Sequence, residues 1–220
     1  MQLLTLAQLR AIEEQALIRD EDLVALAGSA SASWLANNFD KKSRILVVVG
    51  RGNNGADGIS CAIELIKLGY KVDLVRLFKD STEVNQKWLS QFTESKRALI
   101  RLPADMSKYN VIVDAIYGIG LTHEIDVETA GIVQKLNNHN GFMVSLDSPS
   151  GLNPFSGRVL GDAIYADATL TFISDKPGLH TGDGLDFSGD IHVIDLVKLT
   201  DYSVPSSMNV IKFNQMSDVN

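Results

Sequence analysis

The stretch Ile45–Ser60, ILVVVGRGNNGADGIS, decides which fold this chain can adopt. It opens with five apolar residues, continues with glycines at positions 50, 52, 55 and 58, and returns to apolar residues at helical spacing from Ile59 onward. This order predicts a buried strand, a tight glycine loop and the start of a helix. Because a helix start has unpaired backbone N–H groups and the positive end of the helix dipole, we expect this junction to bind phosphate.

The glycine loop contains the Gly-x-Gly-x-x-Gly pattern of dinucleotide-binding proteins, at positions 50, 52 and 55. An ordinary dehydrogenase also has an acidic residue at the end of the next strand, where it holds the ribose. The next expected strand is 72–77, whose acid, Asp73, lies near the start and whose end is Leu77. The pattern therefore disfavours an NAD(P)-dependent oxidoreductase, which we keep as an alternative.

Three polar residues, Asn53, Asn54 and Asp57, lie within the loop. Asp57 puts a negative charge where a pyrophosphate would rest. One interpretation is an aspartate that only stabilises the helix start. We prefer the interpretation that Asp57 and the two asparagines form a polar site that binds more than phosphate.

The composition is that of a globular protein, with 45% hydrophobic and 21% charged residues among 220, enough for one sizeable domain. The formal net charge is -7 and no basic cluster offsets it, so we expect neither nucleic acid nor an anionic membrane surface as a partner. No apolar run approaches the ~20 residues of a membrane span. The single cysteine, Cys61, excludes an internal disulfide and fits a reducing compartment, so we expect a cytoplasmic protein.

The rest of the chain alternates between strand and helix patterns. A capping box at Thr5–Gln8 opens a first helix, and a second runs over about 22–37. The small residues in the middle of that second helix indicate tight core packing, with a dimer interface as the less favoured interpretation. Further strands are expected at 72–77, 98–102, 110–116, 142–146, 168–173 and 191–196, and helices at 81–92 and 127–136. This alternation predicts an α/β fold with a mainly parallel sheet covered by helices on both faces.

Three polar loops should meet if strands 45–49, 110–116 and 142–146 are neighbours, because parallel sheets bind ligands beyond the carboxyl ends of their strands. The loops are GRGNNGADG, DAIYGIGLTHE and DSPSG, and their side chains are rich in oxygen, which disfavours zinc and favours a hard cation. Asn54, Asp114 and Ser150 would suit a weakly charged ion. Asp114 is explained equally well as a strand-end carboxylate that caps loop N–H groups.

Asp147 is the candidate general base, because the turn SLDSPSG presents it rigidly. It could instead hold a ribose or an amide. Lys176 in DKPG could be catalytic, could contact phosphate, or could be a solvated loop lysine. No histidine or cysteine forms a familiar nucleophile pattern with the serines of that turn, which disfavours a serine hydrolase.

Four motifs, GRGNNGADG, DAIYGIGL, SLDSPSGL and ADATLTFISDKPGL, occur in this order. With them the chain resembles the NAD(P)H-hydrate epimerase family, the YjeF N-terminal domain, from Thr5 to about Leu196. The resemblance implies a Rossmann-like three-layer αβα sandwich that interconverts the R and S epimers of hydrated NADH and NADPH. It implies a domain over 1–200, followed by a tail or the start of a linker over 201–220.

The resemblance also implies site residues. One potassium ion would bind Asn54, Asp114 and Ser150, and Asp147 would be the base, with Lys176 sharing the proton transfer. The substrate contacts would be Asn53, Asn54, Gly55, Ala56, Asp57, Gly118, Ile119, Gly120, Leu121, Thr122, His123, Glu124 and Asp147.

The chain departs from the family pattern at a few positions. Ala56 replaces a usual glycine, His123 stands where a basic residue is frequent, and a glutamate usual near Ala25 is absent. The expected partners are the hydrated nucleotide and a fused or separate dehydratase that consumes the S epimer, and a homodimer is considered. A non-catalytic nucleotide-binding or scaffold module of the same fold is the other alternative.

Overall fold

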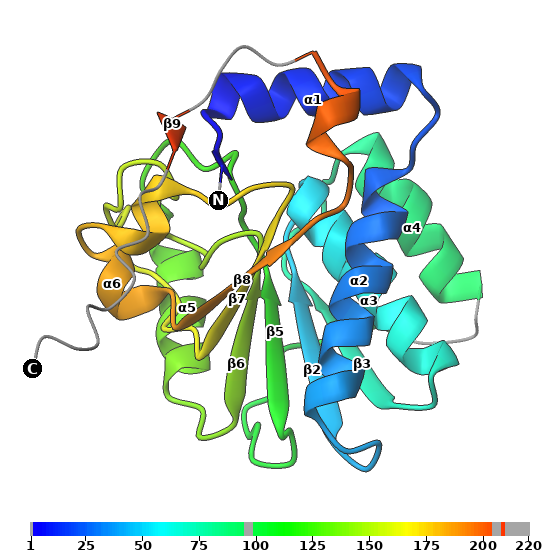
Figure 1. The fold of residues 1–220 in the computed structure, drawn as a ribbon. Coiled ribbons are helices and arrows are strands. Elements are labelled where there is room, and N and C mark those ends of the chain that lie inside the picture. The colour runs from blue at the N-terminus through cyan, green and yellow to red at the C-terminus, as the bar shows by residue number, and fades with distance from the viewer. Residues whose placement is uncertain (1, 95–98, 204–207, 210–220) are drawn as a thin grey trace, which may run out of the picture.

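The computed structural model describes residues 2–94, 99–203 and 208–209, and within them seven strands form one parallel sheet (Figure 1). The strand order is β4-β3-β2-β5-β6-β7-β8. The strands are β2 (Arg44–Val49), β3 (Lys71–Arg76), β4 (Leu99–Ile100), β5 (Val111–Ala115), β6 (Phe142–Leu146), β7 (Ala168–Phe172) and β8 (Asp190–Ile194). Each expected strand is confirmed, and every pairing between neighbours in this sheet is parallel.

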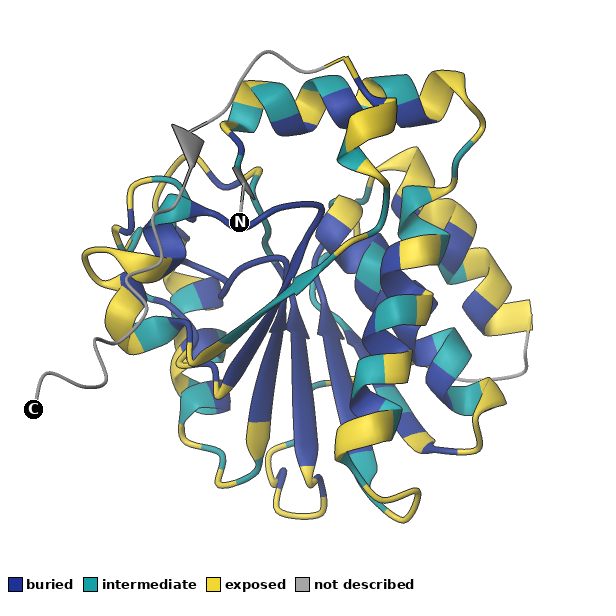
Figure 2. Ribbon diagram, viewed as in Figure 1, coloured by how far each residue is buried: buried dark blue, intermediate teal, exposed yellow. Residues whose placement is uncertain are grey.

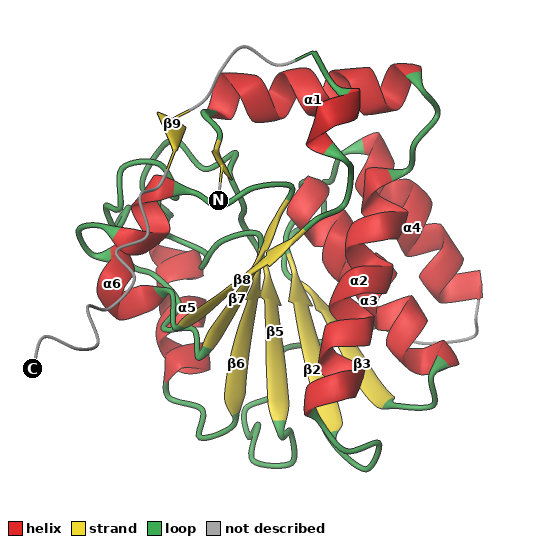
Figure 3. Ribbon diagram, in the orientation of Figure 1, coloured by secondary structure: helices red, strands yellow, loops and turns green. Residues whose placement is uncertain are grey.

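Helices cover both faces of the sheet and complete the predicted three-layer sandwich (Figure 3). They are α1 (Leu6–Ile18), α2 (Leu23–Asn38), α3 (Asn53–Lys67), α4 (Glu83–Glu94), α5 (Val127–Asn137) and the short α6 (Gly184–Phe187). Side chains of β2 alternate between two cores: Ile45 and Val47 join α2, α3 and α4, whereas Leu46 and Val48 join α5. The central strands are buried almost throughout (Figure 2).

The sheet reverses its order between β2 and β5. From β2 the chain moves outward to β3 and β4, and from β5 it moves the other way to β6, β7 and β8. The expected adjacency of the strands beginning near residues 45, 110 and 142 is therefore confirmed. The loops that follow these strands leave from the same edge, which is where sheets of this kind bind ligands.

Helix α3 begins at Asn53, with Gly52 as its N-cap, and not near Ile59 as the apolar pattern suggested. The expectation of a loop through Gly58 was wrong because these glycines serve close packing within a helix. A Cβ atom at Gly58 would come within 2.5 Å of Ala115 Cβ, and one at Gly55 within 2.2 Å of the Gly50 carbonyl oxygen. The first turns of α3 can thus lie directly against the ends of β2 and β5.

Close packing also explains the small residues of α2. A Cβ atom at Gly28 would lie 2.1 Å from Ser60 Oγ on α3. Ala27, Ser31 and Ala32 are buried as well. The interpretation as tight core packing within the chain is confirmed for these residues.

Helix α1 lies across the carboxyl ends of the central strands (Figure 1). Thr5 caps it as predicted, with Gln8 completing the capping box. At the chain ends, β1 (Gln2–Leu3) pairs antiparallel with β9 (Met208–Asn209). This pairing was not expected, and residues 204–207 and 210–220 of the expected tail lie outside the described residues.

In the part of the chain that the structure describes, no helix combines the length and the apolar character needed to cross a bilayer.

Candidate active site at the carboxyl ends of the strands

Asp114, near the end of β5, is fully buried and accepts four hydrogen bonds. Its Oδ1 accepts from Ser150 Oγ at 2.6 Å and Ile116 N at 3.2 Å, and its Oδ2 accepts from Ser145 Oγ at 2.8 Å and Ser150 N at 2.9 Å. Burial raises the pKa of Asp114, and these hydrogen bonds oppose that rise. Ser150 Oγ also accepts from Tyr117 N at 2.8 Å. Asp114 therefore does cap loop N–H groups, and Ser150 ties the loop after β6 to the loop after β5.

Asp147 occupies a strained turn at the end of β6. Its φ is 66°. Its backbone N–H donates a hydrogen bond to the Leu170 carbonyl at 2.7 Å, and Ser148 N donates to the Leu146 carbonyl at 2.8 Å. This is a γ-turn with positive φ, which is rare and costs free energy. Such strain is found preferentially where a side chain must be presented for function.

The carboxylate of Asp147 has two partners. Oδ2 accepts from Ile119 N at 2.9 Å, and Oδ1 lies 2.9 Å from Lys176 Nζ. The Asp147 side chain is 13% exposed, so one edge of the pair can meet a ligand. A carboxylate held by an ammonium and a backbone N–H has a fixed orientation.

Lys176 is fully buried, so the interpretation as a solvated loop lysine was wrong. Its Nζ donates to Thr171 Oγ1 and to the Phe172 carbonyl on β7. A second turn with positive φ, at Ile173, directs the chain after β7. A φ of 69° is a clear outlier for a β-branched residue such as Ile173. This backbone conformation costs free energy, which the rest of the fold must offset to hold the loop in place.

Asn54, in the first turn of α3, is 7% exposed, and neither amide atom of its side chain has a hydrogen-bond partner among the described residues. A Cβ atom at Gly118 would lie 3.2 Å from Asn54 Cβ and 2.5 Å from Asp147 Oδ2. Asn54, Gly118 and Asp147 are therefore neighbours. A buried amide without partners costs about 1–3 kcal/mol per group, which indicates that a ligand completes its hydrogen bonds.

Two more carboxyl groups belong to this region. Burial, and then the charges of Asp147, Glu13 and Asp22, raise the pKa of Asp57 well above its usual range. Burial and then Asp147 also raise the pKa of Glu13 on α1, while Arg10 and Lys176 act in the opposite direction. Glu13 was missed from the sequence. The available signal was its spacing, four residues after the buried Leu9 and thus on the apolar side of α1.

The other predicted substrate contacts divide into three groups. Gly55 lies against the Gly50 carbonyl, and Ile119 donates to Asp147. Ala56 and Leu121 are buried in the two cores. Those at the surface are Asn53, Gly120, Thr122, His123 and Glu124.

Asn85 on α4 supports the glycine loop and was also missed. It is fully buried, and its Nδ2 donates to the carbonyls of Gly50 and Gly52, at 3.1 Å each. Nothing in the sequence sets this asparagine apart from a surface residue of an amphipathic helix.

A cation at this edge would be held mainly by neutral oxygens. The described residues contain no group of three or more histidine, cysteine, aspartate or glutamate side chains suited to a metal. Asn54 Oδ1 lacks a partner, Ser150 Oγ is fixed, and Asp114 supplies one negative charge. This donor set fits a weakly charged cation bound by oxygen.

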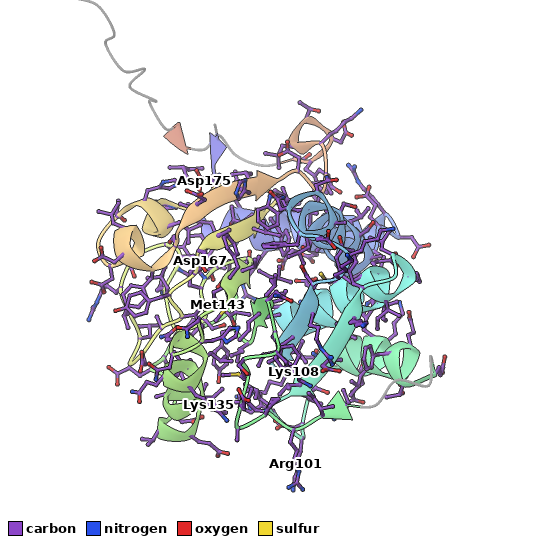
Figure 4. The ribbon with its side chains drawn as sticks, turned by 90° about the horizontal axis from the view of Figure 1, so that it is seen from below. Arg101, Lys108, Lys135, Met143, Asp167 and Asp175 are labelled. Carbon is purple, nitrogen blue, oxygen red and sulfur yellow. The ribbon has the colours of Figure 1, made fainter. Side chains whose placement is uncertain are left out.

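The amino ends of the strands, at the opposite edge of the sheet, have a different set of side chains. A hollow of about 700 Å³ there is lined by polar residues that include Lys135 and His139. Figure 4 views the molecule from that side and labels Lys135, on α5, and Lys108. The Nζ of Lys108 lies 3.3 Å from Asp73 Oδ2. The groups around Asp147 lie at the opposite end of the sheet.

Comparison with known proteins identifies the family of this chain. The chain matches the family described as YjeF-related protein N-terminus over residues 20–178. A protein of Weissella koreensis named NAD(P)H-hydrate epimerase is 36% identical over 163 residues, which cover 73% of each chain. A bifunctional NAD(P)H-hydrate repair enzyme of Dictyoglomus turgidum is 28% identical, and the match covers all of this chain and 45% of that protein.

Among solved structures, yeast ynu0 superposes with a TM-score of 0.75 at 20% identity and covers 98% of each chain. That likeness supports the fold. The family match over residues 20–178 includes the glycine loop, Asp114, Asp147 and Lys176. The chain belongs to the YjeF-related protein N-terminus family.

Proposed function

We propose that this protein is an NAD(P)H-hydrate epimerase, an isomerase that interconverts the R and S epimers of hydrated NADH and NADPH. The observation that carries the proposal is the buried pair of Asp147 and Lys176, 2.9 Å apart, beside the unpartnered amide of Asn54. Relatives that carry the name NAD(P)H-hydrate epimerase or bifunctional repair enzyme match most of this chain.

The chemistry of epimerisation suits this pair. Inverting a hydroxyl-bearing carbon requires a proton acceptor and a proton donor and needs no hydride partner. Asp147 is the acceptor in this proposal, because its carboxylate is partly exposed and oriented by Lys176 and Ile119 N. Lys176 would share the proton transfer or hold the negative charge of Asp147 in place.

The nucleotide would bind differently from that of a dehydrogenase. The N-terminus of α3 at Asn53 offers backbone N–H groups to phosphate. Strand β3 ends at Arg76, so no carboxylate is available there to hold a ribose. This argues against the oxidoreductase alternative.

Potassium is part of the proposal, with Asn54, Asp114 and Ser150 as ligands. When bound, it would supply a positive charge that offsets part of the negative charge of the acidic side chains. We also propose residues 1–200 as the catalytic domain. A dehydratase, fused or separate, would act on the S epimer; the bifunctional relative from Dictyoglomus turgidum is consistent with this.

The test starts from one purified epimer of hydrated NADPH. The protein should bring it to the equilibrium mixture of epimers, followed by chromatography, faster than buffer alone does. A rate equal to that in buffer would overturn the proposal. Oxidation of NADPH in the presence of carbonyl compounds would favour the oxidoreductase instead.

A further inference from the structure

We propose that Glu13 of α1 is a substrate-positioning residue of this active site, whose carboxyl group contacts the hydrated nicotinamide end of the ligand opposite Asp147. The inference rests on the proposed function and adds to it a residue from a helix outside the sheet.

The first argument is the placement of α1. This helix crosses above the carboxyl ends of the strands (Figure 1), and its residues Leu9, Ile12 and Ala16 are buried in the core that also contains Ala56 and Ile173. The helix is held at its far end, where Ser203 N donates to Gln15 Oε1 at 3.1 Å. A side chain on its inner face therefore has a fixed position over the site.

The second argument is the state of the Glu13 side chain. It is half-buried, whereas the adjacent Glu14 is exposed. Within the residues that the structure describes, Glu13 has no hydrogen bond and no ion pair. Its carboxyl oxygens are not fully buried, so they are accessible to a ligand as well as to water.

The third argument is electrostatic. Glu13 interacts electrostatically with Asp147 and Asp57, which are also acidic, and burial followed by the charge of Asp147 raises the pKa of Glu13. The positive groups near it are Arg10 of the same helix and Lys176. Lys176 already pairs with Asp147 at 2.9 Å. Three carboxyl groups therefore repel one another in this region, and only Asp147 is paired with the buried ammonium group.

A bound ligand would give the unpartnered side chains of Glu13 and Asn54 hydrogen-bond partners. The side-chain amide of Asn54, which lies beside Asp147 and has no hydrogen-bond partner, can form hydrogen bonds with a ligand. The hydrated nicotinamide carries a ring hydroxyl and a carboxamide, which can donate to and accept from carboxyl groups. Glu13 then fixes the ring from the α1 side while Asp147 and Lys176 act from the sheet.

The experiment compares Glu13→Ala with Glu14→Ala, the same change one residue further along the helix on an exposed side chain. Glu13→Ala should raise KM about three- to tenfold, the usual worth of a buried hydrogen bond, with a smaller change in kcat. Glu14→Ala should keep both constants. Equal constants in the two variants would overturn the inference.

Glu13→Gln separates positioning from a purely structural role. The wild-type KM should rise with pH as Glu13 ionises, because an ionised carboxylate can no longer donate a hydrogen bond to the carboxamide oxygen of the ligand. Glu13→Gln should recover part of the loss seen in Glu13→Ala and show a flatter dependence of KM on pH. A lowered Tm with the wild-type pH dependence would show a structural role only and overturn the inference.

Asp147→Asn, assayed in parallel, keeps the two proposals apart. If Asp147→Asn is inactive while Glu13→Ala behaves as wild type, the inference about Glu13 falls and the proposed function stands. If the wild-type protein does not epimerise the substrate at all, the proposed function falls, and the inference with it.

Discussion

The carboxylate of Asp147 is bound by a buried ammonium and a backbone N–H, and it sits on a strained turn. Asp147→Asn keeps the size of the side chain and can still accept from Ile119 N, but it removes the proton acceptor. Turnover should fall by roughly two to four powers of ten, while binding of NADPH, measured by calorimetry, should weaken far less.

The matched control is Asp186→Asn, because Asp186 is an exposed aspartate in α6 and is not one of the proposed site residues. It should keep wild-type turnover. Near-native turnover of Asp147→Asn would instead move the catalytic assignment to Lys176.

Asp57 gives a prediction about pH. Its pKa is raised in the folded protein, first by burial and then by Asp147 and Glu13, so the folded state binds its proton more tightly than the unfolded chain does. Stability is therefore lost as the pH rises from the ordinary carboxyl pKa through the raised value. Asp57→Asn removes this loss, so the variant should have the higher Tm, by a margin that grows as the pH rises above the ordinary carboxyl pKa.

Thermal unfolding of the wild type, Asp57→Asn and Asp186→Asn across that pH range provides the measurement. The exposed Asp186→Asn should follow the wild type. A Tm difference for Asp57→Asn that stays constant with pH would contradict the assigned cause.

The sequence predicted a site residue only where a polar side chain lies at or just after the end of an expected strand. Asn54, Asp147 and Ser150 follow strands and Asp114 lies near the end of one, and the sequence places them at the edge where they are found. Glu13 lies about forty residues before Asn54 on a separate helix, and only the tertiary packing of α1 brings it over the site. Periodicity within one element cannot show which distant element its buried face meets.

At the scale of elements, the close contact of α3 with β2 and β5 depends on missing side chains. Gly58→Ala should destabilise the protein by about 1–3 kcal/mol, because the added methyl would lie 2.5 Å from Ala115 Cβ and 2.9 Å from Val49 Cγ1. Gly131→Ala, in α5, meets no atom within 4 Å and should stabilise by roughly 0.5–1 kcal/mol through helix propensity.

Chemical denaturation of the two variants measures both effects. If Gly58→Ala were as stable as Gly131→Ala, the glycine would not be required for packing. Gly58→Ala should also lower activity, because a displaced α3 carries Asn54 away from Gly118.

The elements themselves were largely predictable, because buried strands and amphipathic helices have distinct periods. The start of α3 was not, since glycines that allow close packing look the same in sequence as glycines that form a loop. The pairing of β1 with β9 was also missed, because two residues give no periodic pattern.

At the scale of the whole molecule, a cation bound by side chains from three separate segments would stabilise the entire fold. Asn54 belongs to α3, Asp114 to β5, and Ser150 to the loop after β6. A ligand that binds only the native state raises stability by RT ln(1 + [L]/Kd), about 2.7 kcal/mol at a hundred times Kd. Potassium should therefore raise Tm more than sodium at equal ionic strength, because the larger ion suits a set of mainly neutral oxygens whose positions the backbone fixes.

Asn54→Ala provides the matched test of this prediction. It removes the unpartnered amide but leaves the hydrogen bonds of Asp114 with Ser145 and Ser150 in place, so the fold should persist. The variant should lose the difference between potassium and sodium, while any general effect of salt on Tm should remain. Equal Tm shifts in the two salts for the wild-type protein would count against a potassium site here, and a preserved potassium preference in Asn54→Ala would move the site away from the start of α3.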